Sequence, residues 1–308
     1  MTILYSHPAA TAHLVPEGHP ERPARVAAVL GALEGLDLER REAPLAEDAD
    51  LLRCHPQAYL DRIAAAVPAS GLAPLDADTW LSPGSEEAAR RAAGAACAAV
   101  DAVVAGEDGS AFVAMRPPGH HAEAETPMGF CLYGTAAIAA RRAMEVHGLT
   151  RVAIADFDVH HGNGTQALLW DEERARFVSS HQMPLWPGTG APDERGAHQQ
   201  ILNLPLAPGT RGQAFAAAWA PALGWLDAFA PELVIVSAGF DAHEDDPLAG
   251  LRLTEDDFAA ITARLAALAR RHAGGRLVSI LEGGYDLAAL GRSARAHVGA
   301  LTSPGEDP

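Results

Sequence analysis

The sequence predicts an α/β fold in which a mainly parallel sheet is flanked by helices. Short apolar runs of strand type alternate with Ala-rich segments of helical character along the chain, and this alternation is typical of such a sheet. Three of the runs, around residues 152, 234 and 278, are apolar throughout rather than at every second position. Strands covered on both faces show this pattern, so we expect these three strands to be central.

Strands and helices are expected to follow one another regularly. The opening segment MTILYSHP is interpreted as a short first strand. Further strands are expected at AFVAM (111–115), RVAIA (151–155), FVSS (177–180), LVIVSAG (233–239) and RLVSIL (276–281). Helices are expected where Ala, Leu, Arg and Glu dominate and small or apolar residues recur at helical spacing, at 23–36, 85–106, 133–147, 213–229, 255–272 and 287–300.

Two of these helices carry start signals. Ser85 precedes two glutamates and Thr254 precedes three acidic residues, and both are expected to be N-cap residues because acids in the first turn suit the helix dipole. No internal repeat, low-complexity tract or Gly/Ser linker divides the chain. We therefore predict a single domain over residues 1–302 and a frayed tail at 303–308.

Length and composition narrow the class of protein. A chain of 308 residues is within the size that large α/β folds reach as one unit, and no apolar run approaches the roughly 20 residues that cross a bilayer. The N-terminus lacks the basic and long apolar stretches of a secretory signal, so we expect a cytoplasmic protein without a membrane partner. Three cysteines without CxxC spacing predict reduced thiols rather than disulfides or a thiolate zinc site.

The charge of the chain bears on its ligands. A formal net charge of −17 repels phosphate backbones, and nucleic-acid binding generally needs clustered basic residues. Nucleic acid is therefore excluded as the main ligand. An acidic protein attracts cationic small molecules, which leaves acylated polyamines open as substrates.

Four clusters of polar residues follow predicted strands. In open α/β sheets, ligands bind beyond the carboxyl ends of the strands, so these clusters are the first candidates for a site. A single Asp or His at a strand end is as readily a helix cap or a loop anchor, but four clusters at four strand exits favour a functional site. They are RPPGHH (116–121), DFDVHHGNGTQ (156–166), GFDAHEDDP (239–247) and EGGYD (282–286).

The second and third clusters predict a metal site. Residues 156, 158 and 160 share parity, so their side chains project to one side if the chain stays extended. Asp158 and His160 then form a two-ligand arm, and Asp241 follows another central strand as the third ligand. Three protein ligands leave a position for water or a substrate carbonyl. Two carboxylates with one imidazole are a harder set than most zinc enzymes use, so zinc is favoured and iron(II) stays an alternative.

The adjacent histidines of the first cluster predict acid–base chemistry. Burying His120 and His121 as packing residues would require partners for several ring nitrogens. Histidine titrates near neutral pH, so general acid–base catalysis explains the pair better.

Six motifs follow one another along the chain: RPPGHH, GFC (129–131), DFDVHHGNGTQ, PGTG (187–190), SAGFDAHEDDP and EGGYD, after HPERPAR and DTWLSPGS (78–85) nearer the N-terminus. Together they resemble the zinc-dependent histone deacetylase and acetylpolyamine amidohydrolase superfamily, in its class II and bacterial branch. The resemblance covers nearly the whole chain. It implies the arginase-deacetylase fold, a three-layer α/β deacetylase domain with a mainly parallel sheet of about eight strands.

The resemblance also implies catalytic roles. It implies that the zinc is bound by the same three ligands, Asp158, His160 and Asp241. His120 and His121 match the family's histidine pair, with Asp156 expected to orient His120. Tyr285 matches the tyrosine that donates a hydrogen bond to the developing oxyanion. Asn163 stands behind His121 where class I members carry an aspartate, and a neutral amide favours an imidazolium less than a carboxylate does.

The substrate channel and a second ion site are implied in the same way. Phe130 and Trp186 match the aromatic walls of an acyl-lysine channel, and the carbonyl of Gly129 would accept the substrate amide N–H. Arg25 is assigned to the inner channel, although an arginine in an amphipathic helix is more often on the surface. Leu248 stands where a polyamine-selective relative would place a glutamate. A structural potassium ion would be held, partly through backbone carbonyls, by Asp156, Asp158, His160, Ser179 and Ser180.

The predicted function is removal of an acyl group, most simply acetyl, from N-acetyl-lysine or a similar small-molecule or peptide amine. An acetylpolyamine deacetylase is the alternative, and an arginase-type ureohydrolase or an inactive acyl-amine binding module is less favoured. The general base is assigned to His121. The sequence leaves open the native metal, the acyl length, the division of roles between the two histidines, and the oligomeric state.

Overall fold

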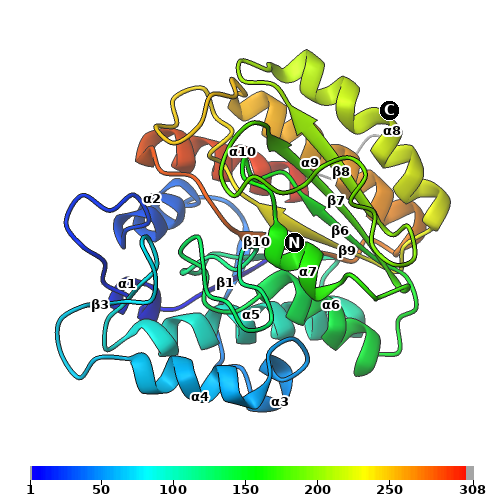
Figure 1. The fold of residues 1–308 in the computed structure, drawn as a ribbon. Helices are drawn as coiled ribbons and strands as arrows, with labels where there is room; N and C mark the ends of the chain where they lie inside the picture. Colours follow the sequence, from blue (N-terminus) through cyan, green and yellow to red (C-terminus); the bar gives the residue numbers. More distant parts are fainter. Residues whose placement is uncertain (1, 303–308) are drawn as a thin grey trace.

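An eight-stranded sheet forms the centre of the protein, whose computed structural model describes residues 2–302 (Figure 1). All neighbouring strands are parallel, in the order β2-β1-β5-β10-β9-β6-β7-β8. The strands are β1 (Thr2–Ser6), β2 (Leu38–Glu42), β5 (Ser110–Val113), β6 (Val152–Asp156), β7 (Ala175–Gln182), β8 (Ile201–Leu206), β9 (Leu233–Ala238) and β10 (Leu277–Leu281). The predicted fold class is confirmed, and the three strands that are apolar throughout are central.

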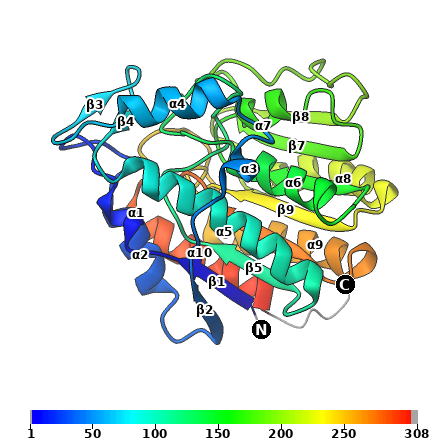
Figure 2. The same ribbon diagram turned by 90° about the horizontal axis from the view of Figure 1, so that it is seen from below.

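Helices cover both faces of this sheet, which gives three layers (Figures 1 and 2). One outer layer contains α2 (Ala24–Ala32), α8 (Gly212–Phe229), α9 (Glu255–His272) and α10 (Leu287–Thr302), and the other is built mainly from α5 (Ser85–Ala105) and α6 (Thr135–Glu145). Shorter elements are α1 (Ala9–Ala12), α3 (Asp48–Leu51), α4 (Gln57–Ala66), α7 (Asn163–Leu168) and the antiparallel pair β3 (Ala73–Pro74) and β4 (Trp80–Leu81). The predicted tail at 303–308 lies outside the described residues.

The two predicted N-caps differ in outcome. Thr254 caps α9 in a capping box, in which its backbone N–H donates to the Asp257 carboxylate at 2.8 Å. The prediction for Ser85 is wrong, because Gly84 occupies the cap position of α5. The Ser85 hydroxyl instead accepts the backbone N–H of Ser82 at 2.7 Å and pairs with Nδ1 of His13 at 2.6 Å. The Ser85 hydroxyl therefore links two loops instead of capping the N-terminus of the helix.

Cys54, Cys97 and Cys131 are free and buried, as predicted. No helix within residues 2–302 has the length and apolar character needed to cross a membrane.

Candidate active site and metal centre

The four polar clusters follow four strands that lie side by side. Strands β5, β10, β9 and β6 are consecutive neighbours in the middle of the sheet, and all are parallel. Their carboxyl ends therefore meet at one edge, although the clusters lie between residue 116 and residue 286 in the sequence. The topology brings together what the sequence suggested only as separate strand exits.

Asp158, His160 and Asp241 converge at this edge. One ligand atom from each lies within 4.8 Å of the others. Nδ1 of His160 is 3.2 Å from Oδ1 of Asp158 and 3.1 Å from Oδ2 of Asp241. Burial raises the pKa of Asp241, and the nearby Asp158 carboxylate raises it further. Two buried carboxylates that face one imidazole suit a divalent cation, whose charge would neutralise them.

Backbone bonds hold these ligands in place. The N–H of Val159 donates to Oδ1 of Asp241 at 2.9 Å, and that of Gly283 donates to Oδ2 of Asp158 at 2.8 Å. The chain is not extended here, because β6 ends at Asp156 and residues 158–160 form bends. The three side chains do come together, but they do so from bends in the chain and not through the alternation of an extended strand.

Two glycines provide the room that the carboxylates occupy. A Cβ added at Gly239 would collide with the Asp158 carboxylate, and one at Gly283 would collide with the carboxylates of Asp241 and Asp158. The backbone of the strand exits thus approaches the two carboxylates more closely than any side chain would allow. This cradle fits a small ion with these three ligands.

The two histidines beside the ligands have different partners. Nδ1 of His120 is 3.0 Å from Oδ2 of Asp156, and Nδ1 of His121 is 2.8 Å from Oδ1 of Asn163. Burial disfavours the charged form of His120, but the carboxylates of Asp158 and Asp156 raise its pKa well above the usual value. Burial and the neighbouring charge of His120 lower the pKa of His121 far below it. The structure thus pairs one histidine that favours its charged form with one that favours its neutral form.

Tyr285 lies in the loop after β10, close enough to Asp241 for that carboxylate to act on its hydroxyl. Its backbone N–H donates to Oδ2 of Asp246 at 2.8 Å, and the guanidinium of Arg25 lies 5.0 Å from the centre of its ring. Burial, followed by the charge of Asp241, raises the pKa of Tyr285 well above 10. The hydroxyl therefore stays protonated and can donate a hydrogen bond.

The predicted channel residues lie around this centre. The Trp186 ring is 4.7 Å from that of His121 and the Phe130 ring is 5.9 Å from that of Tyr285, both in edge-to-face contact. Trp186 is 42% exposed and Leu248 is 37% exposed, so both reach the surface. Gly129 has a φ of 55°, and a Cβ there would press against the rings of His121 and Trp186. Its carbonyl accepts the Cys131 thiol at 3.3 Å.

Arg25 is fully buried, so the surface interpretation of this arginine is wrong. Its Nε donates to the carbonyl of Gly284 at 2.6 Å and its Nη1 donates to Glu21 at 3.0 Å. Glu21 also accepts a hydrogen bond from Arg116 at 2.6 Å, and all three side chains are inaccessible to solvent. This ion network fastens the N-terminal segment to the loop that carries Tyr285.

Sequence reasoning missed two further carboxylates. Oε2 of Glu282 accepts the backbone N–H groups of Gly119 and His120, at 2.7 and 3.1 Å. Asp246 accepts the backbone N–H groups of Tyr285 and Asp286. Both acids lie in motifs singled out above, EGGYD and GFDAHEDDP, but their partners are distant in sequence and gave no signal.

The serines assigned to the potassium site lie on β7, next to β6. Ser179 is directly opposite Asp156 in the ladder. The hydroxyl of Ser180 is buried and has no hydrogen-bond partner among the described residues. The potassium site itself stays a prediction.

Comparisons with known proteins agree on one family. The family described as "Histone deacetylase domain" matches residues 19–301. A protein of Pseudomonas aeruginosa named "Histone deacetylase-like amidohydrolase" is 45% identical over 278 residues, which cover 87% of this chain and 73% of the relative. A "Probable deacetylase" of Archaeoglobus fulgidus is 37% identical over 279 residues, covering 87% of this chain and 77% of the relative.

A solved structure shares the whole architecture. The structure described as "Crystal Structure of HDA15 HD domain" superposes with a TM-score of 0.92 at 32% sequence identity. The match covers 97% of this chain and 87% of the other.

Proposed function

The chain belongs to the histone deacetylase family, and from this premise we propose that it is a zinc-dependent deacetylase of N-acetyl-lysine or a similar acylated amine. The family makes it a hydrolase that acts on amides. The zinc ion and the acyl-lysine substrate go beyond the family assignment and are our proposal. The observation that supports both is the meeting of Asp158, His160 and Asp241 beside His121 and Tyr285.

Zinc is the proposed ion, with iron(II) as the alternative, because the ligand set accepts either. When bound by the three ligands, the ion would polarise the acyl carbonyl and lower the pKa of the attacking water. The structure supports a single-ion site, since within residues 2–302 one group of three such side chains comes together. An arginase-type ureohydrolase uses two manganese ions and more ligands, so it is disfavoured.

His121 is the proposed general base. Its Nδ1 is engaged by Asn163, while Nε2 has no partner within the described part of the chain and is available for a proton. The lowered pKa keeps this imidazole neutral before the reaction. His121 would take the proton of the attacking water as oxygen bonds to the acyl carbon, then deliver it to the leaving amine nitrogen as the C–N bond breaks.

His120 and Tyr285 would stabilise the charge that develops. His120 is held by Asp156 and favours its charged form, so it supplies a positive field next to His121. The Tyr285 hydroxyl would donate a hydrogen bond to the oxyanion that forms from the acyl carbonyl. The products are a free amine and a carboxylic acid.

The rim favours an acyl-lysine over an acetylpolyamine. Leu248 offers no charge to a polyamine cation, and two acidic side chains of the strand-exit loops have partners of their own. Glu123 accepts a hydrogen bond from Asn163 at 2.9 Å, and Asp245 pairs with Arg292 at 3.1 Å. Phe130 and Trp186 supply the aromatic contacts that suit an aliphatic side chain.

Removal of the metal tests the proposal. We expect a prolonged chelator soak to abolish turnover of a fluorogenic acetyl-lysine peptide and added zinc to restore it, because the ion activates both the carbonyl and the water. Elemental analysis should find one zinc ion per chain. Full turnover by protein shown to be metal-free contradicts the mechanism, and release of urea from arginine would point to the ureohydrolase instead.

A further inference from the structure

Two of the predicted channel residues, Gly129 and Phe130, lie on a loop that a helix distant in sequence holds in place. We call residues 122–134, which connect the histidine pair to α6, the channel loop. Three side chains from α4 and the turn before it form hydrogen bonds with the backbone of this loop. They are His55, Tyr59 and Arg62. Their partners are 63 to 79 residues away in the sequence, so only the fold brings them together.

His55 joins the two ends of the channel loop. Its Nδ1 is 3.1 Å from the carbonyl oxygen of Ala124, and its Nε2 is 2.9 Å from the backbone nitrogen of Gly134. A carbonyl can only accept and an amide N–H can only donate, so the ring carries its proton on Nδ1 and accepts at Nε2. The ring is buried, and burial lowers its pKa to about 4. One neutral imidazole therefore closes the loop.

Tyr59 and Arg62 add two further anchors. The buried Tyr59 hydroxyl donates to the carbonyl of Leu132 at 2.6 Å, and its ring stacks on that of His55 with centroids 5.0 Å apart. Arg62 donates to the carbonyl of Glu125, and its guanidinium lies 5.2 Å from the centre of the Tyr59 ring. The three side chains of α4 and its preceding turn thus support one another as well as the loop.

The turn between these anchors has a backbone conformation that needs support. Gly129 has a φ of 55° and Phe130 has a φ of 70°. The left-handed region is uncommon for a residue as bulky as phenylalanine, and it persists where the surrounding structure fixes it. The Thr79 hydroxyl accepts the backbone N–H of Phe130 at 3.1 Å on one side. The anchors from α4 fix the chain before and after the turn.

We propose that His55 and Tyr59 are positioning residues that set the affinity for substrate by holding the channel loop in shape. This inference rests on the proposed function, in which the Gly129 carbonyl accepts the substrate amide N–H and Phe130 walls the channel. The catalytic histidine His121 has its own support from Asn163 at 2.8 Å. Loosening the loop should therefore weaken binding of a long substrate more than it slows the chemical step.

Hydrogen exchange on the full chain measures whether α4 holds the loop. Tyr59→Phe removes one hydroxyl and leaves the Leu132 carbonyl without its donor. Tyr133→Phe is the matched control, because the Tyr133 ring lies 6.2 Å from that of Tyr59 and its buried hydroxyl has no hydrogen-bond partner among the described residues. Amides of residues 122–134 should exchange about fivefold faster or more in Tyr59→Phe and in His55→Phe, as loss of one hydrogen bond predicts. Amides of α9 should be unaffected.

Two hydroxamates separate the channel from the metal. Acetohydroxamate and octanohydroxamate carry the same chelating group, but only the longer one needs the channel. We expect the Kd of octanohydroxamate to rise about fivefold or more in Tyr59→Phe and His55→Phe, and that of acetohydroxamate to stay within about twofold. For an acetyl-lysine peptide, KM should rise in the same proportion while kcat stays within about threefold, because binding is what the loop supports.

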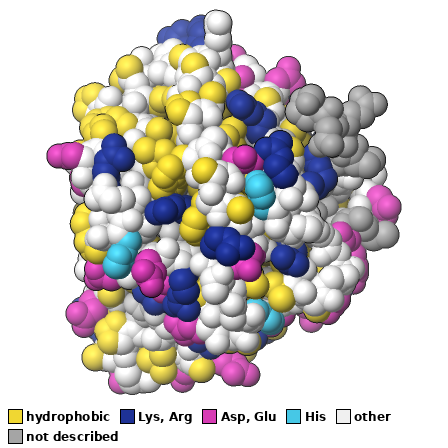
Figure 3. Space-filling view, turned by 90° about the vertical axis from the view of Figure 1, so that its right-hand side faces the viewer, with side chains coloured by type: hydrophobic (Ala, Val, Ile, Leu, Met, Phe, Trp, Pro, Cys, Tyr) yellow, Lys and Arg dark blue, Asp and Glu magenta, His cyan; other side chains and the backbone are white. Residues whose placement is uncertain are grey.

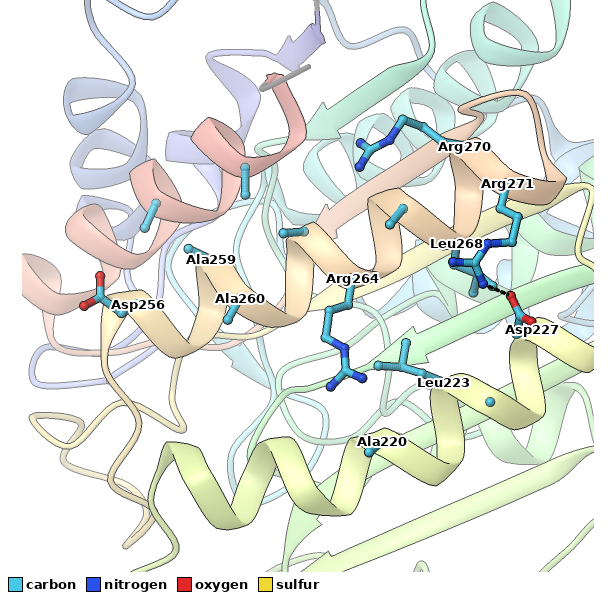
Figure 4. A pocket seen from close by; sticks show the side chains of 15 residues that line it. Ala220, Leu223, Asp227, Asp256, Ala259, Ala260, Arg264, Leu268, Arg270 and Arg271 are labelled. Atoms are coloured by element: carbon cyan, nitrogen blue, oxygen red, sulfur yellow. Dashed lines mark hydrogen bonds and ion pairs between the residues drawn. The ribbon is translucent and has the colours of Figure 1, made fainter. Parts of the chain in front are cut away.

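A control for the exposed Arg62 lies on the opposite side of the sheet. A groove of about 970 Å³ lies between α8, α9 and α10, and Arg264 of α9 points toward α8 there (Figure 4). Figure 3, which looks at the side of the molecule where α8 lies in Figure 1, shows hydrophobic side chains beside several basic ones. Arg264 is exposed and bonds to no other described residue. Arg62→Met should weaken octanohydroxamate binding, whereas Arg264→Met should not.

Two results overturn the proposal. One is that His55→Phe and Tyr59→Phe exchange their loop amides and bind octanohydroxamate as the wild type does. The other is an equal loss of affinity for both hydroxamates, which would mean that the site as a whole has changed. If His55→Phe does not fold, Tyr59→Phe decides. A wild-type protein that binds neither hydroxamate contradicts the metal site of the proposed function instead, and hydrogen exchange, which needs no metal, still shows whether α4 holds the loop.

Discussion

Two adjacent histidines in this site show how a few contacts set opposite protonation preferences. The backbone places His120 beside Asp156 and His121 beside Asn163, at 3.0 and 2.8 Å. The carboxylates of Asp158 and Asp156 raise the pKa of His120, whereas burial and the charge of His120 lower the pKa of His121, so two buried rings shift in opposite directions. The sequence showed the amide at position 163, and the structure brings it into contact with the correct ring.

Tyr285→Phe isolates the proposed oxyanion contact. The variant loses one hydroxyl, while the backbone bond to Asp246 and the contact with Arg25 remain available. We expect kcat for an acetyl-lysine peptide to fall by about 10²-fold or more, comparable to loss of an oxyanion donor. Zinc content and thermal midpoint should stay at wild-type values. Near wild-type turnover by the folded variant would mean that the hydroxyl is structural.

At the scale of elements, the sequence predicted the parts of the sheet that are buried on both faces and missed its edges. The edge strand β2 reads LERRE and has no apolar run, and the opposite edge strand β8 contains a proline. Edge strands are bonded on one side and need little apolar surface, so composition gives no signal for them. The same limit applied to Asp246 and Glu282, whose roles depend on backbone groups that only the folded chain brings near.

One buried histidine links three elements and makes the fold sensitive to acid. His297 of α10 contacts Thr262 of α9 at 2.6 Å and Ser279 of β10 at 2.7 Å, and burial lowers its pKa to about 3. In the unfolded chain His297 takes up a proton near pH 6.5, whereas in the folded chain it stays neutral until the pH approaches 3. This contribution to stability is complete above about pH 6.5 and is lost progressively as the pH falls toward 3.

The comparison of His297→Gln with wild type tests this link. We expect the free energy of unfolding of wild type to fall more steeply between pH 6 and pH 4.5, by about 1.4 kcal/mol per pH unit for the one extra proton. Urea titrations at several pH values measure the difference in slope. Equal slopes for the two proteins would show that His297 is not responsible, even if the variant is less stable throughout.

At the scale of the whole molecule, acidity affects how substrates arrive more than which substrate reacts. A net charge of −17 raises the encounter rate of cationic acetylpolyamines, but attraction over a whole surface does not select between substrates. Under the proposed function, selection belongs to the rim of the channel, where Leu248 is apolar and 37% exposed. The net charge favours the cationic acetylpolyamines and the apolar rim favours the acyl-lysine. Changing the salt concentration separates the two effects, because salt screens the attraction between charges.

We expect kcat/KM for an acetyl-lysine peptide to exceed that for acetylputrescine and acetylspermidine at physiological ionic strength. Low salt should reduce this difference in kcat/KM, because it strengthens the attraction of the cationic acetylpolyamines to the acidic protein. Leu248→Glu should improve the acetylpolyamines relative to the peptide, with Leu248→Met as the uncharged control. A tenfold preference of wild type for an acetylpolyamine, about 1.4 kcal/mol, overturns the expectation and indicates a cation site at the rim.

The position of β10 has a consequence for synthesis of the chain. Among the strands of this sheet, β10 is synthesised last, and it is inserted between β5 and β9, near the middle of the sheet. Until it arrives, two apolar strands have open edges, and such edges are where nascent chains aggregate. Asp158 also lacks the hydrogen bond from the Gly283 backbone N–H until that moment. A chain shortened before residue 277 would therefore expose a divided sheet rather than a smaller enzyme.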